Sequence, residues 1–269
     1  MIRFQVEKLA VTVSDNREEL GLKAAKDAAV YLRTLLTQQA QVNAIFAAAP
    51  SQNEFLAALL RQKDIDWTRV CAFHMDEYVG LAQNAKQTFA YYLDTHIFTL
   101  APFQSIHYIC RSGRTAEEQC TAYTALLQNN PIDVVFMGIG ENGHIAFNDP
   151  HVAKFNDLEL VKIVELDDIC RMQQVHDGCF ASLEDVPSLA VTLTIPALLS
   201  AKRLFCMVPA AAKAQAVKDT LCGEITERCP ASILRTHGDA CLYLDRESAG
   251  LLSIGGDVGV SEAAQNSKA

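Results

Sequence analysis

The stretch "IDVVFMGIGENGHIAFNDP", residues 132–150, joins an apolar run to a glycine-rich segment. The run at 132–137 has the length and composition of a strand that is buried on both faces. Three glycines follow, which let the backbone turn tightly or approach a ligand closely: Gly138, Gly140 and Gly143. His144 comes next, and an imidazole can exchange protons near neutral pH. The stretch therefore predicts either a plain glycine turn or an active site at the end of a strand.

Apolar runs of strand length alternate with segments of helical period over most of the chain. We expect strands at residues 8–13, 43–49, 69–75, 105–109, 132–138, 203–209 and 240–244. We expect helices at residues 16–39, 53–62, 115–128 and 211–221. This alternation is typical of an α/β fold in which a mostly parallel sheet has helices on both faces.

The chain contains no proline- or glycine-rich linker and no internal repeat, which predicts a single domain over residues 1–247. Residues 248–269 are small and polar and include glycines. Such a segment cannot bury enough apolar surface to offset its ordering entropy, so we expect it to be a disordered tail.

The composition limits the possible partners. The chain has 269 residues, of which 50% are hydrophobic, and its formal net charge is -9. We find no basic stripe, which argues against nucleic acid as a partner, although a few local cations would be enough to hold a small anionic substrate. The first residues are too short a run and too charged for a signal peptide or a membrane span.

Nine cysteines are spread singly from Cys71 to Cys241, without a CxxC pair and without the spacing of metal ligands. An odd number of scattered cysteines indicates reduced thiols. We therefore expect a cytoplasmic protein and no metal site.

Ligands of open α/β sheets bind beyond the carboxyl ends of the strands. The segments that follow the predicted strands are therefore the candidates for a site: residues 49–54, 74–80, 138–150 and 209–213. We expect all four segments to converge on one crevice.

Two of these segments carry acids. Asp76 and Glu77 follow an apolar strand directly, so at least one should point into the crevice, where partial desolvation would raise its pKa towards that of a general base. The alternative is a loop in which Asp76 accepts backbone hydrogen bonds. Asp149, five residues after His144, could orient the imidazole as the second member of a pair.

The segment "APSQNE", residues 49–54, has two readings. It could start a helix, with Ser51 as N-cap and Glu54 completing a capping box. It could also bind an anion, because a helix N-terminus offers free N–H groups and a favourable dipole. Lys213 could supply a cation to the same anion, although a single helix lysine is usually exposed.

Two motifs resemble a known family. "FHMDEYVG" (73–80) and "MGIGENGHIAFNDP" (137–150) are similar to motifs of the glucosamine-6-phosphate deaminase (isomerase) family, and the likeness covers roughly residues 10–245. The sister 6-phosphogluconolactonases typically carry "DER" and "GHTASLFP" at these places. The resemblance implies a Rossmann-like α/β fold, no metal or organic cofactor, and conversion of an amino-sugar phosphate to a keto-sugar phosphate plus ammonia.

The resemblance also implies roles for single residues. Asp76 matches the base that moves a proton between C2 and C1 of the opened sugar, and His144 matches the group that opens the ring. Asp149 matches a glutamate that supports this histidine. Asn142 stands where family members have aspartate or asparagine. Lys213 matches a lysine that binds the phosphate.

The chain departs from the family at the phosphate loop, which usually reads "TGGTP" or "TGSTP" but is "AAPSQ" at residues 48–52. Pro50 has no N–H to donate, whereas Ser51 falls on a residue that contacts phosphate. A family arginine falls near Gln174, and Arg171 or His176 could replace it. Substrate contacts are thus expected from Ser51, Gln52, Glu77, Gly140, Gly143, Arg171 and Lys213.

Three functions follow as hypotheses. The first is an amino-sugar-6-phosphate deaminase acting on the glucosamine or galactosamine compound. The second is a lactonase-like hydrolase, in which His144 would activate water. The third is a non-catalytic sugar-phosphate-binding protein, which would not need both Asp76 and His144. A homo-oligomer is possible, and residues 151–162 show no clear counterpart of the family's activator-binding residues.

Overall fold

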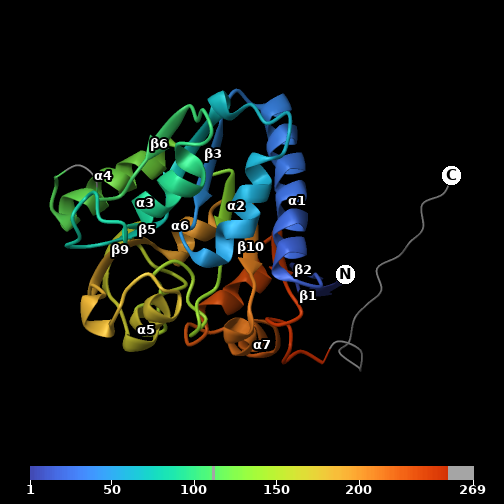
Figure 1. Cartoon of the computed structure of the whole chain (residues 1–269). Helices are drawn as coiled ribbons and strands as arrows, with labels where there is room; N and C mark the ends of the chain where they lie inside the picture. The colour runs from blue at the N-terminus through green and yellow to red at the C-terminus, as the bar shows by residue number, and fades with distance from the viewer. Residues whose placement is uncertain (111–112, 254–269) are drawn as a thin grey trace.

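The computed structural model describes residues 1–110 and 113–253, and its main feature is an eight-stranded sheet (Figure 1). The strand order is β1-β2-β11-β10-β7-β3-β4-β6, and every pairing is parallel except β1 with β2. The strands are β1 Ile2–Val6, β2 Leu9–Val13, β3 Val42–Phe46, β4 Val70–His74, β6 Ser105–His107, β7 Val134–Met137, β10 Arg203–Val208 and β11 Ala240–Leu244. The predicted mostly parallel sheet is confirmed.

Helices cover both faces of this sheet. In β7, Val134 and Phe136 pack into one apolar cluster, whereas Val135 and Met137 pack into another on the opposite face. The first cluster contains residues of α1 (Arg17–Gln38), α2 (Asn53–Leu60), α3 (Phe89–Leu93) and α5 (Asp168–His176). The second contains residues of α4 (Ala116–Asn129), α6 (Ile195–Leu199) and α7 (Ala214–Cys222). This two-sided burial explains why the central strands are apolar at consecutive positions.

Shorter helical segments connect these elements. The 3-10 turns are Pro50–Gln52, Trp67–Arg69, Leu183–Asp185, Ala211–Lys213 and Pro230–Thr236, and a π-helical turn, Asp94–Phe98, continues α3. None of the helices in the described ranges is long and apolar enough to cross a membrane.

A second, three-stranded sheet was not predicted. It has the order β5-β9-β8 and consists of β5 Asp76–Tyr78, β9 Leu189–Leu193 and β8 Val161–Glu165, all antiparallel. The acids expected in a loop after β4 therefore lie in a strand. A strand of three residues is too short for an alternating pattern to be recognised in the sequence. The polar helix α5, with nine residues, is also too short for its helical period to be recognised.

The start of the expected disordered tail is corrected by the structure. Ser248 and Ala249 are buried, and Ser248 exchanges hydrogen bonds with Asp245, whose carboxylate accepts from the Ser248 backbone N–H at 2.8 Å. The chain therefore stays packed beyond residue 247, because a local turn satisfies its polar groups. Residues 254–269, which make up the rest of the expected tail, lie outside the described residues.

Helices α1 and α2 lie side by side (Figure 1) and meet at Gly21. A Cβ atom at this position would lie 2.6 Å from the Glu54 Cβ and 2.8 Å from the backbone nitrogen of Phe55. These atoms belong to the backbone and first side-chain carbon of α2, so they cannot move aside without moving the helix. Gly21 therefore sets the distance at which α1 approaches the start of α2.

We predict that Gly21→Ala destabilises the fold, although alanine is the better helix former by about 1 kcal/mol. Overpacking typically costs about 1–3 kcal/mol, and here it would also displace the first turn of α2. Urea unfolding measures the change. Gly238→Ala is the matched control, since nothing lies within 4 Å of its added Cβ. Equal or higher stability of Gly21→Ala would show that the two helices can separate freely.

Candidate active site

A crevice lies beyond the carboxyl ends of β3, β4, β7 and β10. All four segments expected to converge contribute to its lining, through Ser51, Asp76, Gly140 and Lys213 among others. Residues that were not predicted complete the wall, and they come from helices α1, α3 and α5 and the turn after α5: Arg17, Phe89, Gln173, Gln174 and Asp177. The crevice is therefore assembled from segments that are far apart in the sequence.

Asp76 lies on β5 in this crevice and is 5% exposed. Its Oδ1 has no hydrogen-bond partner among the described residues. Burial raises the pKa of Asp76 well above its ordinary value, and the negative charge of Glu77 adds to the effect. A carboxylate in this state binds a proton more readily than one in water, as a general base near neutral pH requires.

Glu77 points away from the crevice, which corrects the expectation that it contacts a substrate. Its carboxylate accepts hydrogen bonds from the backbone N–H groups of Tyr78, Phe89 and Ala90 at 2.9–3.1 Å. It therefore holds the start of α3. Consecutive side chains of a strand point to opposite faces, so only one of the two acids on β5 can face the crevice.

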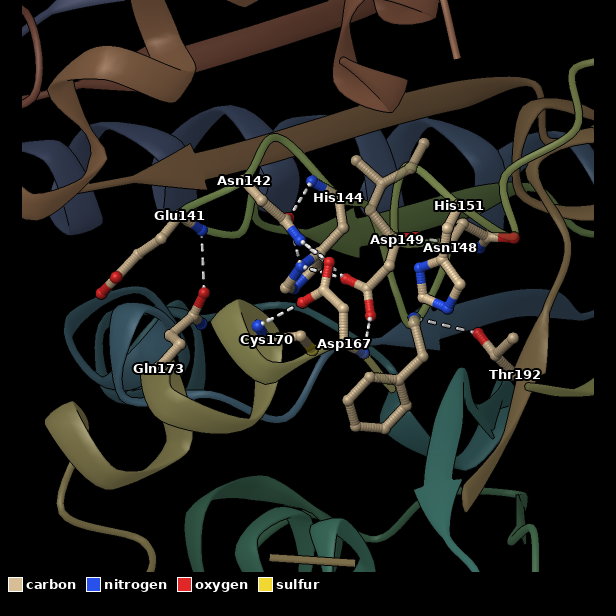
Figure 2. A network of polar contacts seen from close by, with 12 residues as sticks. Glu141, Asn142, His144, Asn148, Asp149, His151, Asp167, Cys170, Gln173 and Thr192 are labelled. Atoms are coloured by element: carbon tan, nitrogen blue, oxygen red, sulfur yellow. Dashed lines mark hydrogen bonds and ion pairs between the residues drawn. The ribbon is translucent and has the colours of Figure 1, made fainter. Parts of the chain in front are cut away.

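His144 belongs to a polar cluster formed with Asn142, Asp149 and Asp167 (Figure 2). The His144 Nδ1 lies 2.8 Å from the Asn142 Oδ1 and 2.9 Å from the Asp149 Oδ1. The Asn142 Nδ2 donates to Asp149 at 3.0 Å and to Asp167 at 3.1 Å. Asn142 and Asp149 do not line the crevice, so they act on its chemistry through His144.

The partners of Asn142 determine which nitrogen of His144 carries the proton. The backbone N–H of His144 can only donate, and it donates to the Asn142 Oδ1 at 3.0 Å. The two carboxylates on the other side can only accept, so the amide oxygen faces the ring. Both neighbours of Nδ1 are then acceptors, and Nδ1 carries a proton. In the neutral imidazole, Nε2 is left as the proton acceptor.

Asp149 remains a strong acceptor although it is fully buried. Burial acts to raise the pKa of Asp149, but the hydrogen bonds from His144 and Asn142 outweigh it and hold the pKa below the ordinary value. The carboxylate therefore stays charged beside the imidazole. A fixed negative charge at this position stabilises the imidazolium that forms when Nε2 takes up a proton.

The two glycines expected to contact a substrate differ in position. A Cβ at Gly140 would lie 2.1 Å from the Cε1 and 2.2 Å from the Nε2 of His144, so only glycine leaves room for the ring. Gly143 does not line the crevice. It has a φ of 83° and its N–H donates to the Gly140 carbonyl at 3.0 Å, which makes it a turn residue rather than a substrate contact.

Ser51 and Gln52 also line the crevice. The predicted capping box is absent, because no side chain caps α2 and Glu54 instead pairs with Arg17 at 2.8 Å. The Gln52 Nε2 donates to the Ser51 Oγ at 3.0 Å and to the Met207 carbonyl at 3.3 Å. The buried Gln52 Oε1 has no partner among the described residues.

Lys213 ends a 3-10 turn immediately before α7 and is 7% exposed, unlike a typical helix lysine. Its Nζ also has no hydrogen-bond partner in the described ranges. Burial lowers the pKa of Lys213, and the nearby carboxylates of Asp177 and Glu141 offset part of this effect. A buried ammonium without a partner is costly, so the part of the crevice beside Lys213 is suited to receive a negatively charged group.

Arg171 does not reach the crevice, which corrects a second expected contact. Its guanidinium donates to the carbonyls of Leu183 at 2.8 Å and Val186 at 3.1 Å, and it pairs with Asp168. His176, on the same helix, pairs with Glu141 at 3.5 Å. Helix α5 therefore directs the side chains of Arg171 and His176 towards these partners, and neither lines the crevice.

Arg17 is the cation that the sequence did not reveal. It lines the crevice, and its Nη2 donates to the Pro50 carbonyl at 3.0 Å and to Glu54 at 2.9 Å. A cation at the first position of a helix is opposed by the helix dipole. That mismatch was the available signal that Arg17 has partners outside its own helix.

Two groups of side chains could in principle hold a metal ion: His144, Asp149 and Cys170, and Asp149, His151 and Asp167. The first group contains the 2.9 Å contact between His144 and Asp149. Two ligands of one tetrahedral zinc ion lie about 3.3 Å apart, given bonds of about 2.0 Å. The pair is therefore spaced for a shared proton.

Fold and crevice together define an α/β protein with a buried carboxylate and a histidine in a crevice at the carboxyl edge of a mostly parallel sheet. The chain belongs to the glucosamine-6-phosphate isomerase/6-phosphogluconolactonase family, whose model matches residues 15–242. It is 35% identical over 212 residues to a glucosamine-6-phosphate deaminase of Listeria welshimeri, covering 79% of this chain and 88% of that protein. A deaminase of Bacillus cereus is 36% identical over 196 residues, or 73% of each chain.

Solved structures agree with this assignment. A monomeric glucosamine-6-phosphate deaminase superposes with a TM-score of 0.80 and 28% identity, covering 90% of this chain and 99% of that one. A 6-phosphogluconolactonase of Thermotoga maritima superposes with a TM-score of 0.73 and 17% identity, covering 88% and 100%. The second likeness shows the shared fold alone.

We predict that Asp76→Asn stabilises the fold at neutral pH. Because the folded-state pKa of Asp76 is raised, its burial penalty is absent below the unfolded pKa of about 3.9 and grows as pH rises above that value, until it is complete above the folded pKa. The variant should therefore exceed the parent in denaturation midpoint at pH 7 and match it in acid. Asp168→Asn, at an exposed carboxylate, is the control. A less stable variant at pH 7 would contradict the prediction.

Proposed function

We propose that this protein converts an amino-sugar 6-phosphate, of glucosamine or galactosamine, to the ketose 6-phosphate and ammonia. The observation that carries the proposal is the pairing, in one crevice, of a buried carboxylate of raised pKa with a histidine held in a defined tautomer. A site that only binds a sugar phosphate does not need both groups. The named relatives support the same reaction class.

The proposed reaction starts with ring opening. The Nε2 of His144 takes the proton of the O1 hydroxyl, and the resulting imidazolium, stabilised by Asp149, returns a proton to the ring oxygen as the C1–O5 bond breaks. Asp76 then takes the proton from C2 of the open-chain aldose and delivers a proton to C1, while O1 gains a proton and the amino group loses one, which leaves a hydroxyl at C1 and an imine at C2. Water adds at C2, ammonia leaves, and C2 becomes the ketone carbon, so that amino-sugar phosphate and water give ketose phosphate and ammonia.

The phosphate would lie beside Lys213, Ser51 and Gln52. Pro50 removes one backbone donor, so side chains must supply most of the contacts. The Lys213 Nζ has no protein partner in the described ranges, and Ser51 and Gln52 line the same crevice. Arg17 adds a second positive charge, which Glu54 partly neutralises.

A lactonase-like hydrolase is the second candidate, because the family includes such enzymes and the fold is shared. Among the superposed structures, the deaminase is 28% identical to this chain and the lactonase 17%. We also propose a cytoplasmic location, since all nine cysteines are free.

The test is a panel of amino-sugar phosphates and 6-phosphogluconolactone, assayed for ammonia, ketose and acid. We predict ammonia and ketose in equal amounts from at least one amino-sugar phosphate. Acid formed from the lactone, without ammonia from any amino sugar, would favour the hydrolase. Binding without turnover of any compound would favour the sugar-phosphate-binding protein.

We predict that Lys213→Ala raises the KM for the phosphorylated sugar by about one to two powers of ten, because a charge-assisted contact contributes roughly 1.5–3 kcal/mol. Inorganic phosphate should compete with substrate in the parent and less in the variant. Lys218→Ala, an exposed lysine of the adjoining helix α7, is the control. Unchanged KM and unchanged phosphate competition would show that the anion lies elsewhere.

A further inference from the structure

Asp167 holds two elements together through its two carboxylate oxygens. The Oδ1 accepts from the backbone N–H of Cys170 at 2.6 Å and so caps helix α5. The Oδ2 accepts from the side-chain amide of Asn142 at 3.1 Å (Figure 2). Both oxygens are therefore acceptors, and each has a donor from a different segment of the chain.

We propose that Asp167 is a positioning residue for His144, which it controls through the amide of Asn142. With Oδ2 of Asp167 on one side, the Asn142 Nδ2 must point away from the histidine, and the Asn142 Oδ1 must point towards it. The amide oxygen then receives the Nδ1 proton of His144 at 2.8 Å. The role of that proton in ring opening rests on the proposed function, whereas the hydrogen-bond arrangement does not.

A carboxylate is the side chain that position 167 requires. An asparagine in its place could cap α5 with its oxygen, but its NH₂ group would then face the NH₂ group of Asn142. Turning either amide removes this conflict and creates another. If the introduced amide turns, the cap of α5 is lost, and if the Asn142 amide turns, its NH₂ group faces the Nδ1 proton of His144.

A second contact closes the cluster into a ring. The backbone N–H of Asp167 donates to the Asp149 Oδ2 at 3.3 Å, while the Asp149 Oδ1 lies 2.9 Å from the His144 Nδ1. Asp167 thus acts on both acceptors of the histidine proton, on Asn142 by its side chain and on Asp149 by its backbone. Substitution of the side chain leaves the Asp149 contact in place, so we expect a partial loss rather than a complete one.

Helix α5 extends this link to the wall of the crevice. Its residue Gln173 lines the crevice and accepts from the backbone N–H of Glu141 at 2.8 Å (Figure 2). The glycine-rich segment that carries His144 is therefore fastened to α5 at Glu141 and again at Asn142. Helix α5, which contributes Gln173 to the wall of the crevice, is therefore fixed in position relative to the loop that carries His144.

The direct experiment is nitrogen NMR of ¹⁵N-histidine-labelled protein at about pH 9, where imidazoles are ordinarily neutral. The His144 signals are identified by their loss in His144→Gln. In the parent we expect Nδ1 protonated and Nε2 unprotonated. In Asp167→Asn we expect the other tautomer to become populated or the two forms to exchange. Asp168→Asn, the same substitution at the neighbouring exposed acid, should leave the parent spectrum unchanged.

Kinetics give the second readout. A wrong tautomer costs about 10⁴-fold in the serine-protease triad, and with Asp149 still in place we expect about 10–100-fold lower kcat for Asp167→Asn on closed-ring substrate. The KM and the rate on an open-chain analogue should change little. A change confined to thermal stability would indicate that Asp167 only caps the helix.

The outcomes separate this inference from the proposed function. A tautomer change in Asp167→Asn without turnover of any amino-sugar phosphate would support the positioning role and reject the function. Ammonia-releasing turnover with a His144 spectrum identical in parent and Asp167→Asn would overturn the positioning role and leave the function standing.

Discussion

The constraint on which the site depends is the burial of the Asp76 carboxylate with one oxygen unpartnered in the described structure. Strand β5 can place it there because β5 pairs with β9, so its backbone polar groups are satisfied away from water. The neighbouring Glu77 is engaged with the start of α3, and its negative charge makes deprotonation of Asp76 still less favourable. Deprotonation of Asp76 at this place is therefore unfavourable, and the apolar clusters on both faces of the large sheet supply the stability that holds it there.

The polar groups in and beside the crevice differ in how far their hydrogen bonds are satisfied. Around His144, both the ring Nδ1 and the supporting carboxylates have partners within hydrogen-bond distance, which fixes one geometry. In contrast, the buried Lys213 Nζ and Gln52 Oε1 lack partners among the described residues. Catalysis needs a preorganised proton-transfer centre, whereas binding can leave polar groups for the substrate to satisfy. This difference is the basis for proposing that the reacting carbons lie near His144 and Asp76 and the anion near Lys213.

The sequence was sufficient for seven of the eight strands of the large sheet, because these strands contain apolar runs. It missed β1, an edge strand whose residues are mostly exposed and show no apolar run. It was not sufficient for β5, which is too short to show a period, or for the direction of Glu77, which follows from β5 being a strand. Arg171 was expected to contact a substrate, and Arg17 was not considered. Arg171 was chosen because it lies close in sequence to Gln174, where the family has an arginine. The sequence did not reveal that Arg171, in helix α5, points towards Leu183 and Val186.

The most direct measurement follows the bond that the proposed base must break. Amino-sugar phosphate carrying deuterium at C2 is turned over, and the ketose product and recovered substrate are examined by mass spectrometry and NMR. The account predicts that the parent turns over the deuterated substrate more slowly than the unlabelled one and removes the label from C2. It predicts that substrate recovered from Asp76→Asn keeps the label at C2. Loss of the label from C2 at the parental rate in Asp76→Asn would contradict the assignment of Asp76 as the base.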